Sequence, residues 1–523
     1  MKMNFARTFA QLALRYGDHE ALVNIERNRR YSFAGLHRLT NRIVNMMRER
    51  LQLRRGDVYL CMLENDNLSL LHTWTALKGE AAVAYTNLRD AQDEHRAQVE
   101  LLRPKVVFLE NLLLERYFDW LHAAGITVVC MDPPAVPREG LHSFDELLEG
   151  IDDHDPGIQS DTREDVLVYR FTGGTTGKSK CAQYTLDNWL ACRDAFYAES
   201  EQAFDAATRL LHMAPISHGS GLSLLATLFR GGCTLTQNAP DLALWCRNIE
   251  AERVTVGSLV PTLLYRLLDL PAATEHDLSS LQTVYYGAAP MSPSRLAQLQ
   301  QRFGNLFVQI YGATECLQPV ATLGKADHLL ASEAGRLASA GRVAPGVEVM
   351  IVDEHGVELD AGGTGEVWLR SRATIGGYHG NPEATAAEFT EGFWKSGDLG
   401  YIDEQGYLFI VDRKKDMIIT GGFNVYAVEV EAALNAHPDV ALSAVVGIPH
   451  AQWGEAVHAE VVARAGTQPS LEALIEHVKA RLGRFKAPKS VVLVNELPIS
   501  PVGKVLRRQV RDKYWKDQAR SVS

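Results

Sequence analysis

The stretch TGGTTGKSK, residues 172–180, follows the apolar run VLVY at residues 166–169. It combines three glycines, three threonines, a serine and two lysines in nine positions. Such a loop after a strand suits phosphate binding, because glycines let backbone N–H groups approach an anion, hydroxyl groups donate, and lysines add positive charge. A flexible surface turn is the alternative, but turns rarely combine so many donors. We therefore predict a phosphate-binding loop.

The nucleoside-triphosphatase P-loop has a different glycine spacing. That motif requires Gly, four residues, and then Gly-Lys-Ser/Thr. Residues 177–179 match its end, but position 172, where the first glycine would stand, is a threonine. Counting from Gly173 leaves the motif one residue short. A P-loop NTPase is therefore the remote alternative.

Length and composition narrow the class of protein. The chain has 523 residues, which predicts at least two domains. Its net charge of −11 argues against nucleic-acid binding, which needs a basic face. The seven cysteines are scattered without metal-ligand spacing, which predicts buried thiols in a reducing compartment. Neither a signal peptide nor an apolar run of ~18 residues is visible, so we expect a cytoplasmic protein without a membrane span.

Helices and strands alternate along the first two thirds of the chain. Residues 32–50 have apolar side chains at helical spacing behind Ser32, a suitable N-cap. A second helix is predicted over residues 67–79. Strands are predicted at 57–63, 81–84, 104–109, 125–131, 166–169, 210–215, 254–260, 283–286 and 307–311. This rhythm predicts parallel sheets covered on both faces, with ligands gathered at the carboxyl ends of the strands.

The pattern changes after about residue 341. Short β-like segments at 347–353, 365–369 and 407–411 are separated by turns, which predicts an antiparallel or barrel-like subdomain. A charged run at 412–416 precedes renewed α/β texture. We therefore predict an α/β protein with a large N-terminal domain of stacked sheets, residues 1–414, and a small α+β C-terminal domain, residues 415–523.

A series of separated motifs resembles the adenylate-forming superfamily, which includes acyl-CoA synthetases, peptide-synthetase adenylation domains and beetle luciferases. The resemblance runs from Phe33 to Arg508 and is closest to acid–CoA ligases. Its motifs are TGGTTGKSK (172–180), GAAP (287–290), YGATE (311–315), WKSGD (394–398), DRKKDMIITGGFN (412–424) and PISPVGKVLRR (498–508). The first motif departs from the family at Gly173, Ser179 and Cys181, but it keeps every glycine and threonine suited to phosphate. Ser396 replaces a threonine, and Asp412 stands where the family usually has glycine.

The resemblance implies a role for each motif around Mg·ATP. The first motif would hold the β- and γ-phosphates through Thr172, Gly173, Gly174, Thr175, Thr176, Gly177 and Lys180. Gly287, Ala288 and Ala289 would pass under the adenine, and Tyr311, beside Gly312, would stack on it. Thr314 would contact the α-phosphate, and Glu315 with Thr175 would hold Mg²⁺, which prefers hard oxygen ligands.

The remaining motifs concern the ribose, the domain movement and the second substrate. Asp398 would accept both ribose hydroxyl groups, and Arg413 would contact ribose or phosphate. Lys415 would be the hinge of a mobile C-terminal domain. Gly421 and Gly422 would line the pantetheine path of coenzyme A. Lys504 would bridge the substrate carboxylate and the α-phosphate during adenylation.

The implied reaction has two steps, and the loop PISHG at residues 215–219 bears on its substrates. A carboxylate would attack the α-phosphate, and a thiol would then displace AMP. Amino-acid-activating domains usually carry an aspartate where His218 stands, so an amino acid is disfavoured. His218 would gate the thiol tunnel or, alternatively, be a packed loop histidine. The loop has no arginine for a second carboxylate, so a dicarboxylate is disfavoured as well.

The expected substrate pocket leaves several acids and acceptors open. We expect the pocket to involve residues 258–262 and 285–286, and an apolar wall would suit fatty, aryl or polycyclic acids alike. We expect a CoA ligase that uses ATP, Mg²⁺ and coenzyme A. A stand-alone enzyme that loads a carrier protein is the second hypothesis. The identity of the acid and the oligomeric state, a homodimer included, remain open.

Overall fold

The apolar strands of the first third of the chain form one sheet. The computed structural model describes residues 1–134, 136–172, 179–199, 201, 204–329, 335–500 and 503–515. Seven strands pair in the order β11-β10-β5-β4-β6-β7-β8. They are β4 (Val58–Met62), β5 (Ala82–Tyr85), β6 (Val106–Leu109), β7 (Thr127–Cys130), β8 (Leu141–Ser143), β10 (Val166–Phe171) and β11 (Cys181–Thr185). All neighbours are parallel except β10 and β11. The five strands predicted here are confirmed.

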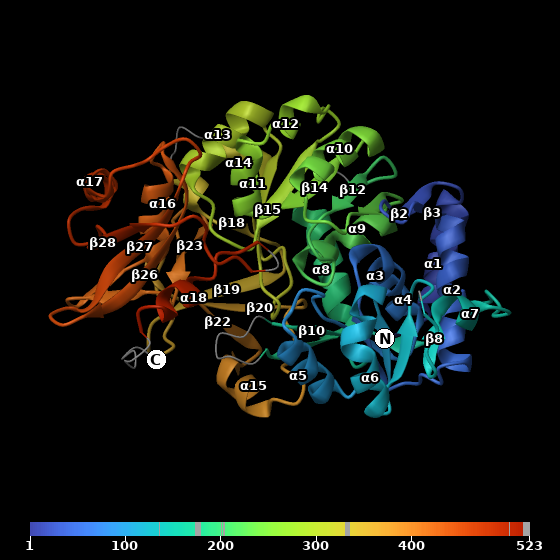
Figure 1. Ribbon diagram of the computed structural model, residues 1–523. Helices are drawn as coiled ribbons and strands as arrows, with labels where there is room; N and C mark the ends of the chain where they lie inside the picture. The colour runs from blue at the N-terminus through green and yellow to red at the C-terminus, as the bar shows by residue number, and fades with distance from the viewer. Residues whose placement is uncertain are drawn as a thin grey trace.

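A larger sheet lies beside the first (Figure 1). Its parallel part consists of β2 (Glu20–Asn24), β13 (Cys233–Thr236), β12 (Arg209–His212), β14 (Val256–Leu259), β15 (Thr283–Gly287) and β16 (Phe307–Tyr311), with β3 (Arg29–Ser32) antiparallel at the edge. Its antiparallel part consists of β17 (Ala321–Leu323), β18 (Gly341–Val343), β19 (Val347–Val352), β20 (Gly365–Ser371), β21 (Phe389–Thr390), β22 (Phe393–Ile402) and β23 (Tyr407–Arg413). The predicted antiparallel segment therefore continues the large sheet through β17 and β18.

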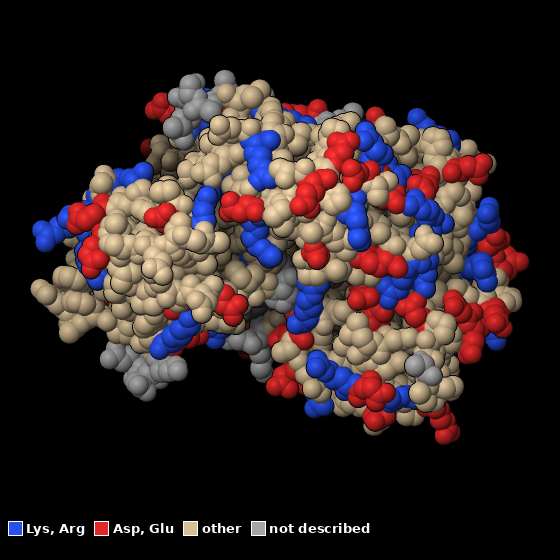
Figure 2. Space-filling model, turned by 45° about the horizontal axis from the view of Figure 1, so that its top comes forward, with Lys and Arg blue, Asp and Glu red and all other residues tan. Residues whose placement is uncertain are grey.

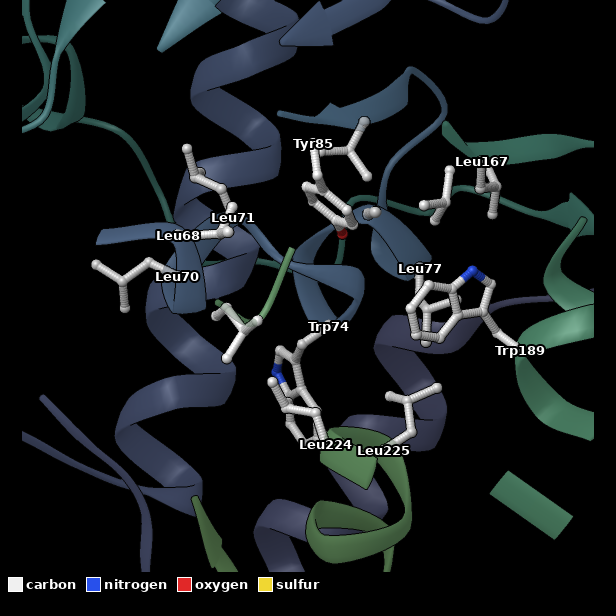
Figure 3. Packing of buried hydrophobic residues seen from close by; sticks show 14 of the residues in the cluster. Leu68, Leu70, Leu71, Trp74, Leu77, Tyr85, Leu167, Trp189, Leu224 and Leu225 are labelled. Carbon is white, nitrogen blue, oxygen red and sulfur yellow. The ribbon is translucent and has the colours of Figure 1, made fainter. Parts of the chain in front are cut away.

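Helices fill the space between the two sheets and cover their outer faces. The intervening layer holds α1 (Phe5–Tyr16), α2 (Phe33–Glu49), α3 (Asn65–Leu71), α4 (Thr73–Lys78), α8 (Leu186–Glu199) and α9 (Leu224–Phe229). Figure 3 shows its apolar packing, in which Trp74 of α4 lies beside Leu224 of α9. The outer faces carry α5 (Gln92–Leu102) and α6 (Leu114–Ala123) on one sheet, and α10 (Leu242–Glu252), α11 (Pro261–Leu268) and α13 (Pro293–Phe303) on the other.

The remaining short elements lie mostly at the edges of these layers. They are β1 (Lys2–Met3), β9 (Ser160–Asp161), α7 (Phe144–Leu148), α12 (Ala272–Glu275), α14 (Lys325–Leu329), α15 (Pro382–Glu388) and three 3₁₀ turns, Asn111–Leu113, Gly219–Ser223 and Arg336–Ala338.

One predicted helix is interrupted. Ser32 caps α2 as expected, since its side chain accepts a hydrogen bond from the Gly35 N–H group. The helix expected over residues 67–79 instead divides into α3 and α4 at His72, whose backbone is extended. The His72 ring is buried, stacks on Tyr85 at 4.6 Å and contacts the Ile216 carbonyl oxygen through Nε2 at 3.1 Å. With these contacts, His72 has an extended backbone instead of the helical backbone of a residue inside a continuous helix.

The last hundred residues fold around a sheet of their own, coloured orange to red in Figure 1. It contains β24 (Ile418–Thr420), β25 (Phe423–Val425), β26 (Val440–His450), β27 (Gly454–Ala463) and β28 (Ser490–Leu493). Helices α16 (Ala427–Asn435) and α17 (Leu471–Leu482) pack on one face, and α18 (Arg507–Asp512) packs on the other. We call this part the C-terminal unit. The C-terminal unit begins shortly after β23 in the sequence. The domain boundary between residues 414 and 415 remains a prediction.

The cysteines are buried, as predicted. Acidic and basic side chains are interspersed over the face shown in Figure 2. All seven cysteines are buried as free thiols. Within the described ranges, every helix is too short or too polar to cross a bilayer.

Candidate functional site

The predicted phosphate loop is closed by a strand pair. The Thr172 N–H group donates to the Lys180 carbonyl oxygen at 2.8 Å, where β10 and β11 pair antiparallel. The predictions for Gly173, Gly174, Thr175, Thr176 and Gly177 fall outside the described residues. Thr172 Oγ1 is buried and has no hydrogen-bond partner within the described chain. A buried hydroxyl without a partner is costly, so a ligand oxygen at this position would stabilise it.

Lys180 belongs to a network that reaches Glu315. Its Nζ donates to Glu388 Oε1 at 2.6 Å and to Oε2 at 2.7 Å, and it lies 4.4 Å from the centre of the Tyr378 ring. The Tyr378 hydroxyl is 2.8 Å from Glu315 Oε1 and 2.6 Å from Glu388 Oε2. Burial raises the pKa of Glu315, while its hydrogen bond to Tyr378 lowers that pKa. The Lys180 ammonium and the carboxylates of Glu315 and Glu388 therefore all contact Tyr378.

Small residues shape the carboxyl ends of β15 and β16. A Cβ on Gly287 would lie 2.1 Å from the Ile310 carbonyl oxygen, and a Cβ on Gly312 would lie 2.6 Å from Gln318 Cβ. Ala288 has a φ of +65°, a conformation that L-residues seldom adopt. Side chains at either glycine would displace the neighbouring backbone. The predicted adenine platform, Gly287 to Ala289, thus stands beside the Tyr311–Gly312 turn.

Three predicted nucleotide contacts meet next to this platform. The Tyr311 hydroxyl donates to Asp398 Oδ2 at 2.7 Å, and Arg413 Nε lies 3.2 Å from Asp398 Oδ1. These residues come from β16, β22 and β23. Asp398 is 7% exposed, and its N–H group donates to Ser396 Oγ at 3.0 Å. Asp398 has further acceptor capacity, since an ionised carboxylate offers about four lone-pair positions.

Lys504 reaches this group from the C-terminal unit. The preceding Gly503 has a φ of +84°, and its carbonyl oxygen accepts a hydrogen bond from Thr262 Oγ1 at 2.6 Å. The pKa of Lys504 is lowered to about 8, mainly by burial and then by the charge of Arg413, and Asp398 partly offsets these effects. The chain thereby brings a lysine far along the sequence to the Asp398–Arg413 pair.

His218 stands near Lys504 and is electrically neutral at ordinary pH. Burial lowers the pKa of His218 to about 3, and the positive charges of Arg170 and Lys504 act in the same direction. His218 Nδ1 lies 3.0 Å from Ser217 Oγ. The ring can accept or donate a hydrogen bond, but it does not carry charge beside the lysine.

The structure adds residues that the sequence analysis missed. Asn65 Nδ2 donates to the Ala214 carbonyl oxygen at 3.1 Å, and Asn65 Oδ1 accepts from the Ile216 N–H group at 2.9 Å. Arg170 Nε donates to the Ser217 carbonyl oxygen at 3.1 Å. Although the loop itself has no arginine, Arg170 supports it from β10. An arginine within an apolar strand sequence is unusual, and it could have drawn attention to Arg170 in the sequence.

Arg170 is a buried cation next to the predicted reaction centre. It is 5% exposed, and its Nη1 has no hydrogen-bond partner among the described residues. Its guanidinium carbon lies 5.9 Å from the centre of the Tyr184 ring, and the Tyr184 hydroxyl donates to the Thr314 carbonyl oxygen at 2.6 Å. Arg170 therefore connects the His218 loop with the strand end that carries Thr314 and Glu315.

Two predicted contacts lie elsewhere on the C-terminal unit. Gly421 and Gly422 have φ values of +58° and +83° and form the turn between β24 and β25. The Gly421 N–H group donates to the Trp453 carbonyl oxygen at 2.9 Å. Burial lowers the pKa of Lys415 to about 8, with Arg413 as the next cause. In this arrangement Lys504 interacts electrostatically with Asp398, whereas Gly421 lies against Trp453.

Comparisons with known proteins agree with this arrangement. The sequence model of the AMP-binding enzyme family matches residues 9–379, and that of the AMP-binding enzyme C-terminal domain matches residues 429–504. The chain is 40% identical over 375 residues to the medium/long-chain-fatty-acid–CoA ligase FadD8 of Mycobacterium tuberculosis. The aligned region covers 70% of this chain and 65% of that relative.

Two further likenesses extend the comparison. The fatty acid–[acyl-carrier-protein] ligase ScoC of Streptomyces coeruleorubidus is 34% identical, with 75% of this chain and 76% of the relative covered. The ATP-bound crystal structure of MatB from Rhodopseudomonas palustris has a TM-score of 0.87 and 28% identity, with 98% of this chain and 99% of that chain covered. Since the first family model alone covers well over half of the residues, the chain belongs to the AMP-binding enzyme family, within the adenylate-forming superfamily that its motifs resemble.

Proposed function

We propose that this protein is an AMP-forming acid–thiol ligase that activates an apolar carboxylic acid with ATP and transfers the acyl group to coenzyme A. The observation that carries the proposal is the position of the Lys504 segment: the Gly503 carbonyl oxygen accepts a hydrogen bond from Thr262 at 2.6 Å, and Lys504 interacts electrostatically with Asp398 and Arg413. A fatty, aryl or polycyclic acid fits the proposal, because the relatives in the comparison act on fatty acids and β14 and β15 present mostly buried residues beside the site.

In the first step, a carboxylate oxygen of the acid attacks the α-phosphorus of ATP. The bond from that phosphorus to the bridging oxygen breaks, and pyrophosphate leaves with the electron pair. Lys504 offsets the negative charge that accumulates in the transition state, and Thr314 contacts the α-phosphate. Asp398 and Arg413 hold the ribose, while Thr172 and Lys180 hold the departing phosphates.

Glu315 offers a suitable donor for Mg²⁺. Mg²⁺ is usually bound through one or two carboxylates together with phosphates and waters. The Glu315 side chain is buried, and Tyr378 contacts it through Oε1. A bound Mg²⁺ would supply positive charge to the phosphate oxygens. The part that Thr175 takes in this site belongs to the same proposal.

In the second step, the sulfur of coenzyme A attacks the acyl carbonyl carbon and AMP leaves. We infer that the C-terminal unit turns about Lys415 between the steps, which withdraws Lys504 and brings Gly421 and Gly422 to the site. The neutral His218 would line the thiol path in this second step. The same fold would thus serve two reactions in sequence.

Carrier-protein loading is the second candidate, because ScoC is named for an acyl-carrier-protein substrate. Both candidates share the first step and differ only in the thiol. A direct comparison of coenzyme A with a phosphopantetheinylated carrier protein separates them. Faster thioester formation on the carrier would replace the CoA proposal while leaving adenylation intact.

A panel of carboxylic acids tests the proposed activity. The protein is incubated with MgATP, coenzyme A and fatty, cinnamic, benzoic or steroid acids, and AMP and thioester are quantified. We expect AMP and thioester in equal amounts, only when an acid is present. ATP hydrolysis to ADP without any acid would instead support the P-loop alternative.

Adenylation should fall as pH rises through the pKa of Lys504. This pKa is lowered to about 8, mainly by burial, so the required ammonium is present below that pH and lost above it. We expect kcat/KM for ATP in acid-dependent pyrophosphate exchange to decline about tenfold per pH unit above the pKa. The Lys504→Arg variant should lack this decline, because arginine stays charged. Equal decline in both proteins would contradict the role of Lys504.

A further inference from the structure

Asp412 stands where the large sheet leads into the C-terminal unit. It belongs to β23, which pairs with β22 and β18 of the large sheet. Its side chain is 2% exposed. Asp412 Oδ2 accepts a hydrogen bond from the Ala427 N–H group at 2.6 Å, and Ala427 is the first residue of α16. A carboxylate at a helix N-terminus is favourable because it satisfies a free N–H group and faces the positive end of the helix dipole.

The same carboxylate faces Arg507, three residues beyond Lys504. Arg507 Nη1 lies 3.5 Å from Asp412 Oδ1 and 3.6 Å from Asp416 Oδ2. Arg507 Nε donates to Glu431 Oε1 at 2.7 Å, and Nη2 pairs with the other oxygen of Glu431. The segment that carries Lys504 is thereby attached to α16 through Glu431 and to the large sheet through Asp412.

A movement of the C-terminal unit would preserve some of these contacts and break others. Glu431 and Arg507 both belong to that unit, so their pair would persist if the unit turned about Lys415. The contacts from Asp412 to Ala427 and Arg507 join the large sheet to the unit. Such a rotation would break both of them. These contacts therefore stabilise the arrangement of the structure, in which Gly503, next to Lys504, is hydrogen-bonded to Thr262 of the N-terminal part.

We propose that Asp412 is a positioning residue, which holds the C-terminal unit and thereby Lys504 in the adenylating arrangement through the Ala427 N–H group and Arg507. The inference rests on the proposed two-step function and on the hinge near Lys415. Asp412 touches neither substrate nor the reacting atoms in this assignment. Its effect is confined to the balance between the two arrangements of the C-terminal unit.

The Asp412→Asn variant tests this assignment through the separate half-reactions. Asparagine keeps the shape but removes the charge that faces Arg507 and the N-terminus of α16. We expect acid-dependent ATP–pyrophosphate exchange to fall about tenfold or more, because the charge interactions with Arg507 and with the N-terminus of α16 are lost. Thioester formation from a synthetic acyl-adenylate and coenzyme A, measured in a single turnover, should be unchanged or faster. An equal loss in both half-reactions, or no loss in either, would overturn the proposal.

A second variant removes one contact without changing any charge. Ala427 is the first helical residue of α16 and follows the extended Tyr426, a position where proline is readily accepted. Ala427→Pro deletes the N–H group that donates to Asp412. We expect the same direction of change, with a smaller loss of exchange than in Asp412→Asn. Exchange at the wild-type rate in a folded Ala427→Pro protein would count against this contact.

Glu431→Gln serves as the matched control, because it removes a carboxylate from the same arginine within the C-terminal unit. We expect it to leave the ratio of the two half-reaction rates near the wild-type value, whatever its effect on thermal stability. If Glu431→Gln shifts the ratio as Asp412→Asn does, charge on Arg507 rather than attachment to the large sheet is responsible, and the proposal fails. A wild-type protein that forms no adenylate from any acid would refute the proposed function itself.

Discussion

Replacing Lys504 with alanine is expected to abolish the first half-reaction and to spare the second. In the proposed mechanism the ammonium offsets charge at the α-phosphate, and losing one such preorganised donor costs about 10²- to 10³-fold in rate. We therefore expect acid-dependent ATP–pyrophosphate exchange in Lys504→Ala to fall by at least that factor. Thioester formation from a synthetic acyl-adenylate should proceed within about threefold of the wild-type rate, since the proposed rotation removes Lys504 from the site before that step.

The appropriate control is a lysine on the same unit but away from the site. Lys479 of α17 is exposed and pairs with Glu476 at 2.7 Å, so Lys479→Ala removes an ammonium with little structural effect. Both half-reactions should remain at wild-type rates in that variant. If Lys504→Ala instead loses both half-reactions to the same extent, Lys504 supports the fold or both chemical steps, and its assigned role is wrong.

The strands that were predicted in the two sheets have short apolar sequences that end in glycine, proline or polar residues, whereas others, among them β2, β13 and β22, were not predicted. The run at 307–311 coincides with β16, and the run at 57–63 contains β4, which is one residue shorter at each end. The break at His72 was not predictable in this way. It depends on contacts with Tyr85 and Ile216, which are distant in sequence, and helical periodicity contains no information about them.

The candidate site also contains some residues that the sequence identified and others that it missed. Tyr311, Asp398 and Arg413 were singled out by their motifs, and the fold brings them within hydrogen-bond or ion-pair distance. Their roles toward ATP remain predictions. Arg170 was missed because its importance arises from the loop at residues 214–218, which the fold places against β10. Asp412 was noted only as a departure from the family pattern. Its contacts with Ala427 and Arg507 become visible when the C-terminal unit is in place.

Replacing Glu315 with glutamine is expected to have the second-largest effect, on the same half-reaction. Glutamine keeps the size of the side chain and a carbonyl oxygen, but it loses the negative charge that a divalent cation requires. We expect exchange to fall about 10²-fold or more at ordinary Mg²⁺ concentration, as for the loss of a group that stabilises phosphate charge. The apparent Mg²⁺ concentration for half-maximal exchange should rise as well. Because the wild-type carboxylate is buried, the fold should tolerate its replacement by the neutral amide of glutamine.

Tyr378→Phe is the matched comparison for Glu315→Gln. It removes the hydroxyl that contacts both Glu315 and Glu388 but leaves both carboxylates in place. If Glu315 acts through the metal, Tyr378→Phe should retain most of the Mg²⁺ affinity, whereas Glu315→Gln should lose it. If the two variants are equally impaired and neither responds to added Mg²⁺, Glu315 acts through the tyrosine network that also holds Lys180. The Mg²⁺ titration thus separates a metal ligand from a residue that orders the phosphate loop, because only the former changes the concentration of metal that the enzyme needs.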